Sequence, residues 1–328
     1  FCIGTNQIDL SATSARGVAV FNAPYSNTRS VVELAIAEII SLARRLHEKS
    51  TDMHAGVWNK SAAGSHEVRG RTLGIIGYGN IGSQLSVVAE ALGLKVIFYD
   101  IDDKLALGNA KRCSTVEELL AEADVVTLHV DGRPGNAGLF GDDEMRQMKP
   151  RSLFLNLSRG IAVDTAALRT HLESGHIAGA AVDVFPIEPK RQGDAFESDL
   201  RGLPNVILTP HVGGSTEEAQ QDIGRFVASK LRSYTEFGST SLSVNMPELN
   251  LPADQGRCRI AHVHRNAPGV LATINSLFGE RGVNIEAQSL STRGENGYVV
   301  TDVAEAVSAS VLRELGDLPE TVRIRQLS

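Results

Sequence analysis

The sequence predicts an α/β fold in which a doubly wound parallel sheet is followed by a small βαββαβ domain. Apolar runs of strand length alternate with amphipathic helical segments between residues 71 and 210. Residues 257–328 have a separate pattern of strands and helices. Continuous apolar strands that are separated by helices indicate a parallel sheet covered on both faces. Ligands of such sheets bind at the carboxyl ends of the strands.

The apolar runs predict the individual strands and helices of this part of the chain. A long helix precedes them, because Ser30 and Glu33 have the spacing of a capping box and apolar residues recur as far as Leu46. Residues 1–25 are expected to form a short strand, a helical fragment and a strand over 18–22, which cannot bury a core alone. Strands are expected at 72–76, 95–99, 124–130, 152–157, 179–184 and 206–209, and helices near 80–92, 115–122 and 164–174.

A length of 328 residues predicts two or three domains. A helix over 216–237 leads to a glycine- and proline-containing linker. Strands at 259–264, 284–291, 298–303 and 321–327, with helices at 268–278 and 308–315, then give the βαββαβ order. We therefore expect one domain from 1–26 with 214–255, a second over 27–213 and a third over 256–328.

Composition limits the kinds of partner. A net charge of -7 leaves no basic surface for nucleic acid, and no apolar run approaches the roughly 20 residues that span a membrane. Three cysteines, far apart and without a CxxC pair, fit a reducing compartment, so a cytoplasmic protein with small-molecule partners and no metal site is expected. The chain starts at Phe1 in a stretch typical of a buried strand, so it is expected to begin inside a domain.

A glycine-rich turn at residues 77–82 predicts a Rossmann-type dinucleotide site. It follows an apolar strand, precedes a helix, and is followed about 20 residues later by Asp100 at the end of the next strand. Gly77 allows the tight turn, Gly79 lets a pyrophosphate approach the backbone, and Gly82 lets helix and strand pack closely. Asp100 would accept hydrogen bonds from ribose hydroxyls and repel a 2′-phosphate, which favours NAD over NADP.

Three polar residues follow buried strands of the same sheet: Arg159, Glu188 and His211. Each residue type is common at strand ends without any function. Together, at the edge that carries the glycine loop, they predict a dehydrogenase, which needs a proton acceptor, an anchor for the substrate and a cofactor that takes hydride. Arginine presents a planar fork that matches a carboxylate, and a carboxylate beside a histidine favours the protonated imidazole.

The motifs resemble those of the D-isomer-specific 2-hydroxyacid dehydrogenases, in particular the serine-regulated phosphoglycerate dehydrogenase branch. The matching segments are 74–82, Asn-Leu-Ser-Arg-Gly at 156–160, Asp-Val-Phe-Pro-Ile-Glu-Pro at 183–189, Thr-Pro-His-Val-Gly-Gly at 209–214 and Trp-Asn-Lys at 58–60. The resemblance covers nearly the whole chain. It implies that His211 is the acid-base, that Glu188 pairs with it, and that Arg159 binds the substrate's carboxylate and carbonyl oxygen.

The resemblance also implies contacts to the cofactor and the substrate. Asn27 matches a substrate-contacting position, for which a turn or a helix cap is the alternative. Besides the three glycines of the loop and Asp100, the expected NAD contacts are Asn80, Ile81, Leu157, Ser158, Arg159, Asp183, His211, Val212, Gly213 and Gly214.

The C-terminal residues 263–271 resemble an ACT domain, whose strand-to-helix turn binds amino acids. The resemblance implies that His264, Asn266 and Asn284 bind L-serine as a feedback inhibitor. It also implies side-by-side pairing of these domains in a homo-oligomer, expected to be a tetramer. A dimerisation module that does not bind serine is the alternative.

The activity that the resemblance implies is NAD-dependent oxidation of D-3-phosphoglycerate to 3-phosphohydroxypyruvate, the first step of L-serine biosynthesis. The family carries a further N-terminal segment with a basic residue that binds the substrate phosphate, so residues 1–26 and 214–255 are expected to be part of a flavodoxin-like substrate domain. One alternative is another D-2-hydroxyacid dehydrogenase, acting on 2-hydroxyglutarate, glyoxylate or hydroxypyruvate. The other is a non-catalytic protein that senses NAD.

Overall fold

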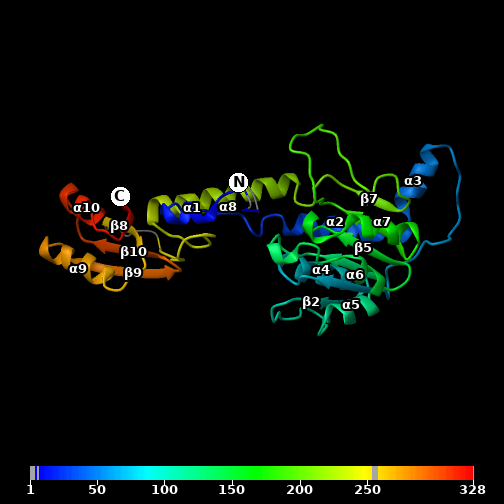
Figure 1. Cartoon of the computed structure of the whole chain (residues 1–328), viewed down its shortest axis with the longest axis horizontal. Coiled ribbons are helices and arrows are strands. Elements are labelled where there is room, and N and C mark those ends of the chain that lie inside the picture. The colour runs from blue at the N-terminus through cyan, green and yellow to red at the C-terminus, as the bar shows by residue number, and fades with distance from the viewer. Residues whose placement is uncertain (1–3, 6, 253–257, 328) are drawn as a thin grey trace. The chain divides into compact units, whose positions relative to one another are not determined.

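A computed structural model describes residues 4–5, 7–252 and 258–327. The strand expected at the very start of the chain therefore lies outside the described residues. The chain forms two compact units, one of Asn27–Ala219 and one of Phe1–Ser26 with Gln220–Ser328. Figure 1 labels the helices and strands of both units.

Within the described residues, the first unit is built on a seven-stranded parallel sheet in the order β3-β2-β1-β4-β5-β6-β7. The predicted doubly wound sheet is confirmed, and the strand order reverses between β1 and β4. Strand β3, two exposed residues at the edge, has no apolar run by which the sequence predicts it. The strands are β1 (Thr72–Ile76), β2 (Lys95–Tyr99), β3 (Lys111–Arg112), β4 (Val125–Leu128), β5 (Ser152–Asn156), β6 (Ile177–Val182) and β7 (Val206–Leu208).

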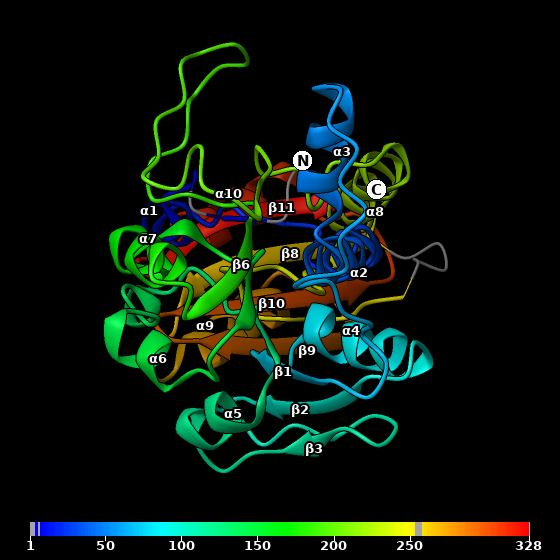
Figure 2. The ribbon, with the colours of Figure 1, turned by 90° about the vertical axis from the view of Figure 1, so that its right-hand side faces the viewer.

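Helices cover both faces of this sheet, as Figure 2 shows. Apolar residues of α2 (Thr28–Arg44) and α4 (Asn80–Ala91) pack on one face. Those of α5 (Val116–Glu122), α6 (Asp142–Gln147) and α7 (Thr165–Glu173) pack on the other. The remaining helices of this unit are α3 (Leu46–His54) and the short 3-10 helices η1 (Pro134–Asn136) and η2 (Gly160–Ala162). Among the described residues, no helix has the length and apolar character needed to cross a membrane.

The start and end of α2 differ from the prediction. Asn27 occupies the N-cap position, so Ser30 lies in the first turn and does not cap the helix. Its hydroxyl lies 2.8 Å from that of Thr216, which belongs to a distant segment. The predicted capping box is therefore wrong, because a tertiary contact takes the serine. The helix also ends before Leu46, since Arg45 adopts a left-handed conformation with a φ of 53° and starts α3.

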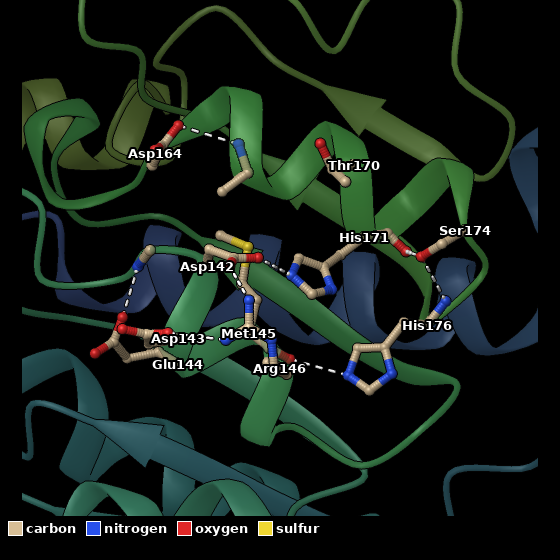
Figure 3. Close-up of polar contacts among 12 residues, drawn as sticks. Asp142, Asp143, Glu144, Met145, Arg146, Asp164, Thr170, His171, Ser174 and His176 are labelled. Carbon is tan, nitrogen blue, oxygen red and sulfur yellow. Dashed lines mark hydrogen bonds and ion pairs between the residues drawn. The ribbon is translucent and has the colours of Figure 1, made fainter.

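Polar side chains join α6 to α7, as Figure 3 shows. Nε2 of His171 on α7 lies 2.8 Å from Oδ1 of Asp142 on α6. Nε2 of His176, which follows α7, lies 3.0 Å from the carbonyl oxygen of Met145 on α6. The carboxylate of Asp164 caps α7 by accepting from two amides of its first turn. These contacts fix the position of α7, which follows the loop after β5.

The second unit contains the predicted βαββαβ domain, whose antiparallel sheet has the order β11-β8-β10-β9 within the described residues. Its two helices pack on one face of the sheet around a core that includes Ile260, Phe278 and Val299. The segment around Met246 covers the other face. The elements are β8 (Cys258–Arg265), α9 (Val270–Glu280), β9 (Ile285–Arg293), β10 (Asn296–Val303), α10 (Ala309–Gly316) and β11 (Thr321–Leu327).

The N-terminal part of this unit contains α1 (Leu10–Ala15), and the unit shares α8 (Glu217–Phe237) with the first unit. The strand predicted over 18–22 does not form; only Phe21 makes an isolated bridge, to Ser243. The side chain of Asn245 forms hydrogen bonds that a neighbouring strand would otherwise form with this segment. It accepts a hydrogen bond from the amide of Val20 at 2.8 Å and donates to the carbonyl of Val18 at 2.9 Å. The prediction is wrong because a side chain satisfies these backbone groups.

Glu38 is an acidic residue on the apolar face of α2. It is 3% exposed, and neither carboxylate oxygen has a hydrogen-bond partner among the described residues. Loss of hydration raises the pKa of Glu38 to about 8 from 4.5, and the nearby charge of Asp183 adds to this effect. The folded protein therefore favours a protonated Glu38.

We expect Glu38→Gln to stabilise the protein increasingly as the pH rises from 4.5 towards 8. In that range the unfolded chain releases the proton of Glu38 and the folded chain keeps it, so wild-type stability falls with increasing pH. The difference in the free energy of unfolding between the variant and the wild type should increase by about 1.4 kcal/mol per pH unit in this range and then level off. Urea denaturation at a series of pH values measures it, and a difference that does not change with pH would contradict the prediction.

Candidate functional site

The glycine loop lies at the carboxyl end of β1, where the strand order of the sheet reverses. Gly77 has a φ of +94°, and a Cβ there would lie 2.6 Å from the carbonyl oxygen of His129. A Cβ at Gly82 would overlap the carbonyl oxygen of Gly77. Both positions therefore require glycine for the fold itself. A Cβ at Gly79, by contrast, would meet no atom within 4 Å, so the loop has open space in front of it.

This open space suits a dinucleotide. Gly79 is the N-cap of α4 and no side chain caps the helix, so the first-turn amides at Asn80 and Ile81 have no partner within the helix. Such a helix end attracts a pyrophosphate through its amides and its partial positive charge. The residues of the loop therefore fit NAD.

Asp100 lies beside the glycine loop, as the sequence predicts. Its Oδ2 accepts a hydrogen bond from the amide of Tyr78 at 2.7 Å, and its Oδ1 accepts from the amide of Asp102 at 2.9 Å. The guanidinium of Arg112, on the edge strand β3, donates to the carbonyl oxygen of Asp100 at 3.3 Å. The carboxylate is thus oriented by the backbone and keeps acceptor capacity for ribose hydroxyls.

His211 and Glu188 are within hydrogen-bonding distance of each other at the same edge of the sheet. Nδ1 of His211 lies 2.9 Å from Oε2 and 3.1 Å from Oε1 of Glu188. The amide of Phe185 donates to Oε1 of Glu188 at 3.1 Å, which orients the carboxylate. Both side chains are partly exposed, at 49% and 38%. The pair leaves Nε2 of the histidine available to a substrate.

Asp183 holds the loop that carries His211. It is 2% exposed and follows β6. Its carboxylate accepts from the hydroxyl of Thr209 at 2.6 Å and from the amides of Val212 and Gly213, each at 2.8 Å. Its carbonyl oxygen accepts from the amide of His211, whose φ of 54° is left-handed. One buried residue thus fixes the backbone on both sides of the histidine.

Arg159 follows β5 and retains free donors. Its Nη1 donates to the carbonyl oxygen of Ser158 at 2.7 Å. The chain at Gly132 lies against it, since a Cβ there would be 3.4 Å from Nε of Arg159. Among the described residues, no hydrogen bond or ion pair joins Arg159 to Glu188 or His211. The structure therefore pairs two of the three predicted residues directly and places the arginine just after the neighbouring strand β5.

The predicted cofactor and substrate residues around them lie at the same edge. Leu157 and Ser158 are buried after β5, and the hydroxyl of Ser158 donates to Asn156. Asn27 lies against Gly214, where a Cβ would overlap its amide nitrogen. It is the N-cap of α2 but makes no side-chain capping hydrogen bond, so its amide is not needed for the cap.

The predicted effector residues divide between the two ends of the antiparallel sheet of the second unit. Nδ1 of His264 lies 2.8 Å from the carbonyl oxygen of Arg265, while its buried Nε2 has no hydrogen-bond partner in the described structure. Asn266 is close by and donates to the carbonyl of Gly294. Asn284 precedes β9 and is exposed. Strands β8 and β9 both pair antiparallel with β10 and run parallel to each other, so the start of β9 lies at the far end from His264.

Two further residues matter that the sequence motifs do not single out. Gly297 on β10 pairs with His264, and a Cβ there would overlap the imidazole ring. Glu38 interrupts the apolar face of α2, where Val31, Ala35 and Leu42 are buried. An acidic residue at apolar helical spacing is a signal that the sequence contains. The need for glycine opposite His264, in contrast, depends on the strand register.

Comparison with known proteins identifies both units. The model of the D-isomer specific 2-hydroxyacid dehydrogenase NAD-binding domain matches residues 36–213, and that of the AHAS small subunit-like ACT domain matches 260–323. The chain is 52% identical over 327 residues to D-3-phosphoglycerate dehydrogenase of Haemophilus influenzae, covering 100% of this chain and 80% of that protein. The Escherichia coli K12 protein of the same name is 53% identical over 329 residues, with the same coverage.

A solved structure with bound cofactor is also similar. D-lactate dehydrogenase of Aquifex aeolicus, complexed with NAD and lactic acid, has a TM-score of 0.64 and 27% identity, covering 71% of this chain and 74% of that one. The NAD that the glycine loop and Asp100 predict is therefore confirmed as the cofactor.

Alanine substitutions at two glycines of the loop should differ in their effects on protein stability and on cofactor binding. We expect Gly79→Ala to cost about 1 kcal/mol or less, because its methyl group enters open space at a helix N-cap. It should nevertheless weaken NAD binding by about tenfold or more, since the methyl group occupies the path of the pyrophosphate. Gly82→Ala should destabilise the protein by about 1 to 3 kcal/mol through overpacking.

Thermal unfolding and NAD titration of the two variants measure the contrast. Equal loss of stability in both would contradict the assignment of open space at Gly79. Unchanged NAD affinity in Gly79→Ala would contradict the position of the pyrophosphate.

Proposed function

Because the chain belongs to the D-isomer-specific 2-hydroxyacid dehydrogenase family, we propose that it oxidises D-3-phosphoglycerate to 3-phosphohydroxypyruvate with NAD. This reaction is the first step of L-serine biosynthesis. The observation that carries the proposal is the close pairing of His211 Nδ1 with the carboxylate of Glu188, at the sheet edge that also holds the glycine loop. The identity of more than half to the phosphoglycerate dehydrogenases named above supports the choice of substrate.

The residues divide the chemistry between them. Nε2 of His211 takes the proton of the substrate hydroxyl as the carbonyl group forms, and Glu188 stabilises the resulting imidazolium through Nδ1. Arg159 binds the substrate carboxylate and the developing carbonyl oxygen with its remaining donors. NAD, when bound, accepts the hydride from the carbon that carries the hydroxyl.

The remaining assignments concern binding. Asn27 contacts the substrate, and residues 1–26 with 214–255 contribute to a substrate domain beside the NAD domain over 27–213. Asp100 binds the ribose hydroxyls. The other NAD contacts are Gly77, Gly79, Asn80, Ile81, Gly82, Leu157, Ser158, Arg159, Asp183 and residues 211–214.

The ACT domain over 256–328 binds L-serine and lowers the activity. The buried, unpartnered Nε2 of His264 supports this role, because it leaves a polar group for a ligand. Six residue steps along β10 separate the partners of His264 and Ile285, about 20 Å at the rise of a strand. One serine therefore cannot reach His264, Asn266 and Asn284 of a single chain. A homo-oligomer, proposed to be a tetramer, brings these residues together across paired ACT domains.

Replacing the acid-base should abolish turnover without removing the cofactor site. We expect His211→Ala in the full-length protein to lower turnover of D-3-phosphoglycerate by about 10²- to 10⁴-fold, with NAD affinity retained. Glu188→Gln should reduce turnover less, because the imidazolium loses a charged partner but keeps a hydrogen bond. The exposed His54→Ala serves as a control.

A spectrophotometric assay of NADH formation measures these effects. A substrate panel with 2-hydroxyglutarate and the reverse reaction of glyoxylate or hydroxypyruvate tests the choice of substrate. Turnover of His211→Ala at the wild-type rate would rule out its role, and failure of every hydroxy acid to react would rule out the enzymatic function.

Serine binding should depend on glycine at position 297. We expect Gly297→Ala to weaken L-serine binding by about tenfold or more, because its methyl group displaces the ring of His264 and with it a hydrogen bond to the ligand. Gly279→Ala on α9 is the matched control, since a Cβ there meets no atom within 4 Å. Isothermal titration calorimetry with serine measures both variants. Absence of serine binding in the wild type would leave the ACT domain as an assembly module only.

A further inference from the structure

We propose that a cavity at the amino ends of the parallel strands, lined by Arg45, Arg71 and Arg151, binds a phosphate group. The cavity has a volume of about 250 Å³. It lies at the opposite edge of the sheet from the glycine loop and His211, the length of a five-residue strand or roughly 15 Å away. The inference concerns a second ligand and holds for any hydroxy acid substrate, so it goes beyond the proposed function.

Three arginines reach this cavity from different segments of the chain. Arg71 and Arg151 directly precede β1 and β5, and Arg45 joins α2 to α3. Gly64 lies beside two of them, because a Cβ there would be 3.1 Å from Nη1 of Arg45 and 3.8 Å from Nη2 of Arg151. Two guanidinium groups therefore converge at one glycine, whose left-handed φ of +73° disfavours any side chain.

The arginines keep hydrogen-bond donors that the protein does not use. Among the described residues, the side chain of Arg151 forms no hydrogen bond or ion pair, and that of Arg71 donates through Nε alone, to a backbone carbonyl at 2.9 Å. Arg45 uses three donors, two towards Glu48 at 2.6 and 2.7 Å and one towards the carbonyl oxygen of Ala63 at 3.4 Å. A guanidinium has five donors, so each arginine retains some for a ligand.

The acidic residues of the cavity are already paired. Glu48 is bonded to Arg45. The carboxylate of Asp124 lies 2.6 Å from Nζ of Lys149, which is not part of the lining, and accepts from the amide of Thr72 at 2.8 Å. The lining thus has three arginines against two carboxylates, one of which is neutralised from outside. The cavity therefore has an excess of positive charge that a small anion would compensate.

The backbone at Arg151 supports a role for its side chain. Its φ of 66° is left-handed, a conformation that glycine adopts without strain and arginine does not. The amide of Arg151 donates to the carbonyl oxygen of His176 at 2.6 Å, which fixes the residue at the start of β5. Glycine would serve the fold better at this position. Strain of this kind points to a function of the side chain that requires it.

The chemistry of the lining selects a small phosphorylated ligand. Guanidinium groups bind phosphate oxygens in pairs, and a phosphate monoester carries nearly two charges at neutral pH. The cavity is smaller than the roughly 300 to 1,000 Å³ of pockets for drug-sized ligands, which suits a free phosphate or one with a short carbon chain. Apolar side chains form another part of the lining: Leu42, Leu153, Leu172 and Ile177.

Calorimetric titration of the full-length protein with inorganic phosphate tests the inference, at constant ionic strength and with NAD present to fill the cofactor site. We expect Arg151→Gly to weaken this binding by about tenfold or more, the factor that corresponds to one lost hydrogen bond to a charged group. Glycine suits the left-handed backbone, so the variant should fold normally. Arg225→Ala should bind phosphate as the wild type does. It is the matched control, because this exposed arginine of α8 pairs with Asp222 at the surface.

Titrations with two further ligands define the chemistry of the site. Tighter binding of glycerol 3-phosphate than of inorganic phosphate would support a phosphate ester whose carbon chain contacts the apolar lining. Tighter binding of inorganic phosphate would support the free ion as the ligand. Succinate tests the alternative of a carboxylate, and stronger binding of succinate than of either phosphate compound would overturn the assignment to phosphate.

Chemical modification locates the bound phosphate. Phenylglyoxal modifies accessible arginines, and mass spectrometry of the peptides gives the rate at Arg151 and, as a control, at Arg225. Phosphate at ten times its dissociation constant should slow the modification of Arg151 by about tenfold, because only the free site reacts. The rate at Arg225 should not change. Equal phosphate affinity in Arg151→Gly and the wild type, or a rate at Arg151 that phosphate does not alter, would overturn the proposal.

Discussion

The candidate site depends on the buried carboxylate of Asp183. A carboxyl group with 2% exposure is costly to bury unless hydrogen-bond donors surround it, and here three donors from one loop do so. The same hydrogen bonds that stabilise the charge also fix the loop, including His211 with its left-handed backbone. The electrostatic need of one residue therefore creates the rigid geometry that acid-base chemistry requires.

The candidate site also depends on close packing of the backbone around the glycine loop. At the reversal of strand order, Gly77 lies against the carbonyl of His129 and Gly82 against the carbonyl of Gly77, which brings α4 close to the sheet. Gly79 is different, because the space beside it is open. Two glycines of the loop thus serve the fold, and the third leaves space for a ligand. Asp100, oriented by the amides of Tyr78 and Asp102, lies beside the loop with its carboxylate in the position that we propose for binding ribose hydroxyls.

In the ACT domain, too, a glycine leaves room beside a polar side chain. Gly297 leaves room for the ring of His264, and that ring keeps a buried nitrogen without a partner. Strand register then separates this histidine from Asn284 by the length of the sheet. Under the proposal that serine contacts both residues, the ligand would bind between two chains, and its binding would be coupled to assembly.

The sequence by itself determined the strands of the parallel sheet, the βαββαβ order, the glycine loop and the residues at the strand ends. These features are local, because apolar runs, helical periodicity and glycine-dependent turns depend on neighbours in the chain. Only the tertiary structure decided that Ser30 binds Thr216 instead of capping α2, and that Asn245 takes the place of a strand beside residues 18–22. It also decided that the carboxyl group of Glu38 is buried without a hydrogen-bond partner among the described residues, and that Asn284 lies far from His264. Each of these outcomes depends on segments that are distant in the sequence, so no local pattern contains them.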